Sequence, residues 1–143
     1  MTRILITTVL FLFSLFAKAQ EKPSSNNQIN VIVKHISSDN GKIYFALYDK
    51  NGFSPRKPLA KATCEVKNQT SKVHFDAVPN GNYAILCFLD ENNNKRLDFN
   101  TTNGRPLELY GISNNPVLFG PPQFEQAKFN VKDNNIFVYI FLQ

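Results

Sequence analysis

The feature that most constrains the fold is a series of short runs rich in β-branched and aromatic residues. In the first run, Ile29, Val31 and Val33 share one face of an extended chain, while Asn30 and Lys34 lie on the other. No segment has a clear amphipathic helical period. The runs that predict strands are 29–36, 42–48, 62–66, 72–78, 83–89 and 136–142, with a weaker one at 127–131.

The segments between these runs have the chemistry of turns. Asp, Asn, Pro and Gly gather at 38–41, 49–52 and 79–81. Short strands joined by such turns predict an all-β fold. We expect a single antiparallel β-sandwich of about seven strands, immunoglobulin-like or transthyretin-like, with one long ordered loop.

The N-terminal segment has the pattern of a secretory signal peptide. Arg3 precedes an apolar run at 4–16, and the small residues Ala17 and Ala19 follow it. The run is shorter than the roughly 20 residues of a membrane span. We therefore expect a protein of the periplasm or a secreted protein, with no membrane span in the mature form. The predicted organisation is a signal peptide over 1–19, a flexible leader over 20–27 and a β-sandwich domain over 28–143.

Charge and catalytic motifs narrow the function further. The net charge of +5 comes from scattered Lys and Arg side chains, so we expect no nucleic acid partner. His35 and His74 have no nucleophile or carboxylate at a motif-like spacing. We therefore predict no catalytic residue and no enzymatic activity.

The two cysteines leave two alternatives open. In an oxidising compartment, Cys64 and Cys87 could form a disulfide. If their strands and the strand of His74 form a meander, the two cysteines flank a middle strand and lie about 10 Å apart, beyond disulfide reach. The alternatives are a disulfide across the two sheets and a pair of buried thiols.

The segment from Asp90 to Gln126 interrupts the rhythm of strands and turns. A connection of this length in a compact domain is usually functional or disordered. Its apolar side chains provide anchors to bury, so we expect an ordered excursion over one end of the sandwich that carries the function. The expected anchors are Leu97, Phe99, Leu107, Leu109, Tyr110, Ile112, Val117, Leu118, Phe119 and Phe124.

Oxygen-bearing side chains recur at alternate positions at the start of this excursion. Asp90, Asn92 and Asn94, followed by Asp98, match positions 1, 3, 5 and 9 of an EF-hand-like calcium loop. A hard cation needs six to eight oxygen ligands, and the carbonyl oxygen of Arg96 would supply one more. The spacing predicts a calcium site in the 90–98 loop.

Two departures from the EF-hand pattern predict weak affinity. Position 6 is Lys95 instead of Gly, and position 12 is Thr101 instead of Glu. Glu108, Glu91 or a water molecule would have to complete the shell, which suggests a dissociation constant of about 10⁻⁴ to 10⁻³ M. The alternative is that the Asp and Asn side chains form Asx-turns without an ion.

The residues after the loop allow two roles each. Glu108 either points outward between its apolar neighbours or turns back toward the loop. Tyr110 either packs on the end of the sandwich or binds a ligand. We expect Gly111 to permit a tight turn beside it.

Four ordered motifs carry a family resemblance. They are the segments 81–85 (GNYAI), 90–98 (DENNNKRLD), 104–115 (GRPLELYGISNN) and 121–129 (PPQFEQAKF). With these motifs the chain resembles the bacterial domain-of-unknown-function family 2141. The resemblance implies a secreted β-sandwich protein with no established activity.

The chain differs from the pattern of that family near the loop. The family commonly has His where this chain has Leu89, and Gly where it has Asn93 and Lys95. Without the His, an oxygen site for calcium fits better than a transition-metal site.

These features together predict a secreted, non-catalytic binding or adhesion-type module with a weak calcium site. Its partner would be an unknown protein or glycan at the cell envelope. The alternative is a small-ligand carrier or an enzyme that uses a pocket beside the 104–124 loop, lined by Tyr110 and Phe119.

Overall fold

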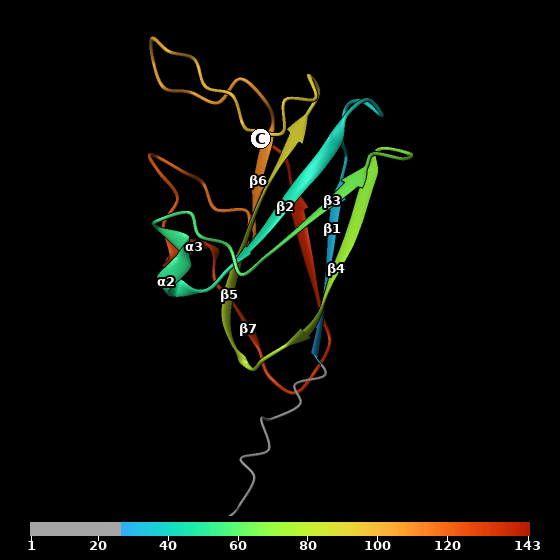
Figure 1. Ribbon diagram of the computed structural model, residues 1–143, viewed down its shortest axis with the longest axis vertical. Helices are drawn as coiled ribbons and strands as arrows, with labels where there is room; N and C mark the ends of the chain where they lie inside the picture. The colour runs from blue at the N-terminus through green and yellow to red at the C-terminus, as the bar shows by residue number, and fades with distance from the viewer. Residues whose placement is uncertain (1–26) are drawn as a thin grey trace, which may run out of the picture.

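Residues 27–143 are described by the computed structural model, and they form two packed β-sheets with very little helix (Figure 1). The all-β sandwich prediction is confirmed. The predicted signal peptide (1–19) and leader (20–27) lie outside the described residues, except for Asn27, which begins the first strand. The elements are β1 (Asn27–Lys34), β2 (Lys42–Tyr48), α2 (Lys50–Phe53), β3 (Ala60–Glu65), β4 (Thr70–Val78), β5 (Gly81–Asp90), β6 (Tyr110–Ile112), α3 (Phe124–Ala127), β7 (Phe129–Val131) and β8 (Ile136–Phe141).

The strands divide between a three-stranded sheet and a five-stranded sheet. The first has the order β4-β1-β8, and the second has the order β3-β2-β5-β6, with β7 also paired to β5. The expectation of a purely antiparallel sandwich was wrong at one pair, because β1 and β8 run parallel. The last strand returns to the first sheet after the long excursion, so no tight hairpin has to join this pair.

The central strand β5 is shared by two short partner strands. Its first residues pair with β7, and residues 86–88 pair with β6. Ser113 is fully buried where these two partners separate. Its backbone N–H donates to the Ile85 carbonyl at 3.0 Å, and its Oγ accepts from the Ile85 N–H at 2.9 Å and donates to the Ala127 carbonyl at 2.6 Å. This serine therefore continues the hydrogen-bonding ladder across the gap.

The core lies between the two sheets, and a smaller apolar cluster lies beneath the helices. Ile29, Val31 and Val33 are fully buried, as their alternation predicts. The Phe53 ring contacts Tyr48 and Phe124 edge to face, each with centroids 5.7 Å apart. This second cluster attaches the excursion to β2 and β5.

The predicted turn at 49–52 is instead the start of the one-turn helix α2. Asp49 is its N-cap, and the Asp49 Oδ1 accepts from the Gly52 N–H at 2.7 Å. Lys50 on α2 lies 3.4 Å from Glu125 on α3, and Lys128 also pairs with Glu125. Turn residues at 49–52 suit both structures, because Asp favours caps and turns alike.

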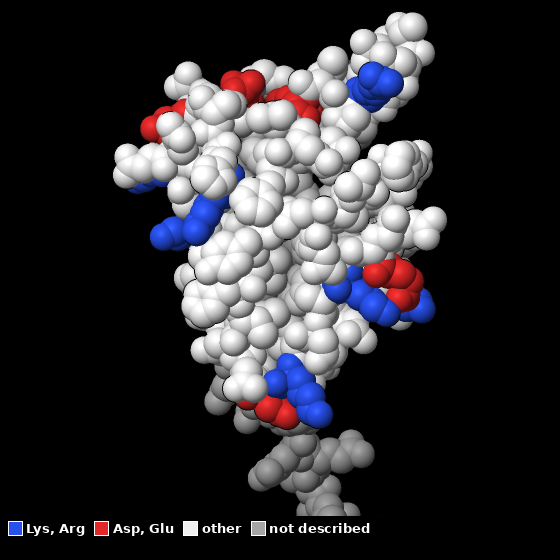
Figure 2. Space-filling model, turned by 180° about the vertical axis from the view of Figure 1, so that it is seen from behind, with Lys and Arg blue, Asp and Glu red and all other residues white. Residues whose placement is uncertain are grey.

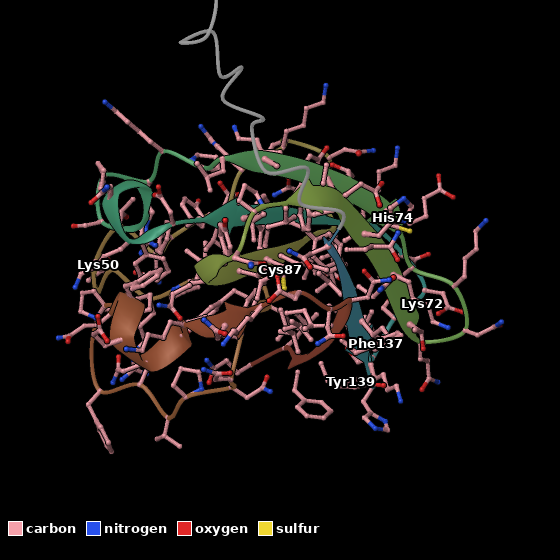
Figure 3. All side chains as sticks on the ribbon, turned by 90° about the horizontal axis from the view of Figure 1, so that it is seen from below. Lys50, Lys72, His74, Cys87, Phe137 and Tyr139 are labelled. Atoms are coloured by element: carbon pink, nitrogen blue, oxygen red, sulfur yellow. The ribbon has the colours of Figure 1, made fainter. Side chains whose placement is uncertain are left out.

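The cysteines are both free, but the meander expected around them was wrong. The strand β4 lies in the other sheet, and β2 is the strand between β3 and β5, with Ile43 opposite Cys64 and Phe45 opposite Cys87. Cys87 lies buried between the sheets (Figure 3), and this burial raises the pKa of its thiol to about 12. Cys64 is only half-buried. The expectation of two buried thiols therefore holds for Cys87 alone.

The outer edge of β8 is covered by side-chain and terminal hydrogen bonds. The Asn115 Nδ2 donates to the Tyr139 carbonyl at 3.0 Å, and the Asn115 Oδ1 accepts from the Phe141 N–H at 2.8 Å. Tyr110 and Gln143 exchange two backbone hydrogen bonds, at 3.2 and 2.9 Å. The amide of one asparagine thus takes the place of a neighbouring strand.

Gly111 brings β6 close to β8, so the expected tight turn at this glycine was wrong. It lies in a strand, and a Cβ atom there would come within 2.4 Å of the Ile140 side chain and 3.1 Å of the Cys87 Sγ. The glycine is required by the packing of the two sheets, because those neighbours are themselves buried.

We expect Gly111→Ala to lower the free energy of unfolding by about 1–3 kcal/mol, because the added methyl group overpacks the core. The matched control is Gly120→Ala, since a Cβ atom at Gly120 meets no atom within 4 Å. Urea unfolding followed by circular dichroism measures both. Equal stability of the two variants would show that β6 tolerates a side chain at this position.

Candidate functional site

The long excursion is ordered and projects from one end of the sandwich (Figure 1). After the 91–98 loop, residues 99–106 fold back on themselves through a bridge between Phe99 and Pro106. The Asn100 N–H donates to the Arg105 carbonyl at 2.8 Å, and the Asn100 Oδ1 accepts from the Thr102 N–H at 2.9 Å. The chain then enters β6 and a second loop before α3. The expectation of an ordered excursion is confirmed.

Asp90 holds the start of the loop from a buried position. It ends β5 opposite Lys42, and its side chain is only 1% exposed. The Asp90 Oδ1 accepts from the Asn94 N–H at 3.2 Å, and Oδ2 accepts from the Lys95 N–H at 2.9 Å. Both oxygens of this predicted ligand therefore bind backbone amides.

Asp98 is the point on which the other predicted ligands converge. The amide nitrogens of Asn92 and Asn94 donate to its Oδ2 at 2.7 and 2.6 Å, and the Arg96 Nε donates to its Oδ1 at 3.1 Å. The hydrogen bond from Asn92, followed by those of Asn94 and the nearby Arg96 charge, lowers the pKa of the Asp98 carboxyl below its ordinary value. The carboxylate is thus held in its charged form.

The loop backbone follows a repeated Asx-turn. The Asn92 Oδ1 accepts from the Asn94 N–H, and the Asn94 Oδ1 accepts from the Arg96 N–H, both at 3.0 Å. Asn93 and Lys95, between these turns, have a φ of 66°, in the left-handed region. In residues 27–143, no group of three or more His, Cys, Asp and Glu side chains is placed to hold a metal ion. The side-chain oxygens at alternate positions thus fold the loop compactly through hydrogen bonds to its backbone, and calcium binding stays a prediction.

Glu108 turns back toward the loop, which is one of its two predicted arrangements. Its Oε2 accepts from the Asp98 N–H at 3.1 Å, while its buried Oε1 has no hydrogen-bond partner among the described residues. Tyr110, the predicted ligand-binding residue, is half-buried against the second apolar cluster. Tyr110 therefore packs on the second apolar cluster and also lines a groove.

This groove lies between the 103–110 segment and residues 118–120, and its volume is about 780 Å³. The lining residues include Arg105, Glu108, Tyr110 and Phe119. Of these, sequence reasoning missed Arg105, which no motif distinguishes from the other scattered basic residues. The lining residues thus form an open groove beside the 104–124 loop, and its use by a small ligand stays a prediction.

Half of the apolar anchors expected in the excursion are exposed. Ile112 and Phe124 are buried, but Phe119 is fully exposed and Val117 is 76% exposed. The expectation of burial was wrong for these side chains, because the excursion projects from the sandwich and has too few neighbouring elements to cover them. The exposed apolar residues of the excursion are Phe99, Leu107, Leu109, Val117 and Phe119.

Fold and site together define a small β-sandwich protein with an elaborated loop region at one end. The chain belongs to the family DUF2141, whose members are described as uncharacterized proteins conserved in bacteria; the match covers residues 31–138. We find no match among curated proteins and none among solved structures. In residues 27–143, no helix has the length and hydropathy needed to cross a membrane.

The two loop positions at which the resemblance led us to expect Gly, Asn93 and Lys95, are the two with positive φ in the 90–98 loop. An L-residue with a long side chain costs about 1–2 kcal/mol in the left-handed region, while Gly costs some backbone entropy. We therefore expect Lys95→Gly to raise the free energy of unfolding by up to about 1 kcal/mol.

Lys61→Gly is the matched control for this prediction. Lys61 is exposed in the regular strand β3, where Gly weakens a strand, so the same substitution should lower stability. Urea unfolding of both variants gives the comparison. A loss of stability in Lys95→Gly would indicate that the lysine side chain contributes more than the backbone strain costs.

Proposed function

We propose that the protein is a non-catalytic binding module of the periplasm or the extracellular space, whose protein partner contacts the apolar surface of the excursion. The observation that carries this proposal is the set of exposed side chains at Phe99, Leu107, Leu109, Val117 and Phe119. Of these five, Leu107, Leu109 and Phe119 line the same groove, and apolar side chains gathered on a surface commonly mark an interaction site. The localisation rests on the signal-peptide pattern at 1–19, outside the described residues.

Several contacts support a surface of fixed shape. The second apolar cluster, the Ser113 hydrogen bonds and the Glu125 ion pairs all hold the base of the excursion. A preordered surface loses less conformational entropy on binding than a mobile loop does. An excursion anchored in this way suits partner binding.

Site-specific photocrosslinking tests the partner surface. A photoreactive residue in place of Phe119 should yield a discrete crosslinked product in the envelope of cells that make the protein. The same residue at Leu59, which is 56% exposed outside the excursion, should not. Equal products from the two positions, or none from Phe119, would contradict the proposal.

A weak calcium site in the 90–98 loop is the second part of the proposal. The amide nitrogens of Asn92 and Asn94 converge on the Asp98 Oδ2, and a cation could take that central place if the amide groups turned their oxygens inward. The unpartnered Oε1 of Glu108 would gain a ligand role. Asp90 and the Arg96 carbonyl would complete the oxygen shell, as in other calcium loops.

Thermal unfolding in calcium, magnesium and chelator tests the site. With a dissociation constant of about 10⁻⁴ to 10⁻³ M, 10 mM calcium should stabilise the fold by about 1.4–2.7 kcal/mol. The effect should vanish in Asp98→Asn and persist in Glu65→Gln, which changes an exposed carboxylate on β3, outside the loop. If calcium leaves the melting temperature of the unmodified protein unchanged, the loop is a set of Asx-turns without an ion.

The groove favours a second candidate function, a carrier of a small ligand. It combines apolar walls at Leu107 and Leu109 with the polar groups of Arg105 and Glu108. Ligand sites commonly place a few polar groups in an apolar surface. A low-molecular-weight compound that copurifies with the protein and is lost in Arg105→Ala would favour this candidate over a protein partner.

A further inference from the structure

A row of aromatic side chains lies exposed on the outer face of the three-stranded sheet, far in the sequence from the excursion. On β8, Val138 and Ile140 face the core, so Phe137, Tyr139 and Phe141 point outward and are 63%, 47% and 49% exposed. Figure 3 shows Phe137 and Tyr139 projecting away from the molecule. Side chains at alternate positions lie about 7 Å apart along a strand. The three rings therefore form a regular, exposed row.

The partner of this row has to lie across the face of the sheet. At the outer edge of β8, Asn115 binds the Tyr139 carbonyl and the Phe141 N–H, so an added strand would have to displace this asparagine. Asn30 lies beside Phe137 in register, with its half-buried amide on the same face. Rings and an amide side chain are thus the groups that a partner meets.

Basic side chains border the rings. The Lys34 Nζ lies 5.0 Å from the centroid of the Tyr139 ring, and His35 stacks on Phe141 with centroids 6.0 Å apart and an angle of 18°. Lys72 and His74 project from β4 at the flank of the row (Figure 3). Figure 2 looks onto this side of the molecule, where a broad area without charged side chains has both basic and acidic groups at its margin.

The same face carries one carboxylate. Asp76 on β4 lies 3.3 Å from the His74 Nε2 and accepts from the Gln28 amide at 2.8 Å. Lys34 and Lys72 outnumber this carboxylate, so the face carries a small net positive charge. A positive margin around an apolar row is complementary to a partner that carries both apolar surface and negative charge.

We propose that this face binds an acidic polysaccharide along β8. The exposed rings would stack on the apolar faces of successive sugars, the Asn30 amide would bind hydroxyl groups, and Lys34 would pair with a carboxylate of the polymer. This site is separate from the excursion, so it does not depend on the function proposed above.

Charge density favours this partner over the other occupants of an aromatic face. A single-stranded nucleic acid carries a phosphate on every nucleotide and requires a continuous basic track, whereas this face offers Lys34 and Lys72. A second copy of the chain would bring the same lysines against one another. A polymer with a carboxylate on only some of its sugars matches the sparse charge.

Calorimetric titration with polygalacturonate, a polymer of uronic acid, tests the proposal, with neutral dextran as the matched polymer. The protein should bind polygalacturonate and bind dextran far more weakly. The double variant Phe137→Ala/Tyr139→Ala should weaken binding at least about tenfold, because two stacking rings are removed. Lys34→Gln should weaken binding several-fold and reduce its salt dependence. Leu59→Ala, which removes an exposed apolar side chain outside both proposed surfaces, is the control that should bind normally.

Three results would overturn the proposal. These are the absence of polygalacturonate binding, full binding by the double variant, and tighter binding of the face to oligo(dT), to anionic lipid vesicles or to a second copy of the protein. The Lys34→Gln variant keeps the test decisive if the double variant fails to fold, because Lys34 is an exposed residue whose removal leaves the core intact. Melting temperatures establish folding for each variant.

Discussion

The fold depends on satisfying the backbone of β5 along its whole length. This strand lies in the middle of the larger sheet, and its two partners on one side, β6 and β7, are each only three residues long. Ser113 supplies the hydrogen bonds at Ile85 where the two partners part. A buried unpaired amide is costly, so this side chain lets the chain leave the sheet, form a loop and helix α3, and return as β7.

That arrangement explains how a small sandwich supports a large excursion. The second apolar cluster packs beneath α2 and α3, and the 90–98 loop is folded by its own side chains through Asp90 and Asp98. The excursion is therefore rigid at its base and in its first loop, while apolar side chains such as Phe119 and Val117 remain uncovered. Order and exposed apolar surface in one segment are the combination that partner binding requires.

The sequence predicted the strands better than their arrangement. Runs of β-branched and aromatic residues identified β1, β2, β4, β5 and β8, and β1 also showed the two-residue period because it buries one face. The strand β6 is too short to show a period and is stabilised by tertiary contacts. The turn residues between β3 and β4 suit a hairpin within one sheet as well as a connection between the two sheets. The sequence therefore could not predict which sheet contains β4.

In the candidate site, the sequence predicted features that depend on neighbouring residues but not those that depend on tertiary packing. The oxygen pattern predicted a compact 90–98 loop, since Asx-turns and ion ligands use the same side chains. The exposure of Phe119 could not be predicted, because burial depends on which elements lie above the loop. Arg105 joined the groove only through the fold of the 99–106 segment.

The asparagine that covers the edge of β8 also has a consequence for solubility. The segment Ile136–Phe141 consists entirely of β-branched and aromatic residues, without charge, proline or glycine. Such a strand can recruit identical strands from other molecules and grow into cross-β aggregates when its edge is open. The Asn115 amide occupies the backbone groups of Tyr139 and Phe141 where that growth would begin. One polar side chain thereby allows the chain to keep an aggregation-prone segment at the margin of a sheet.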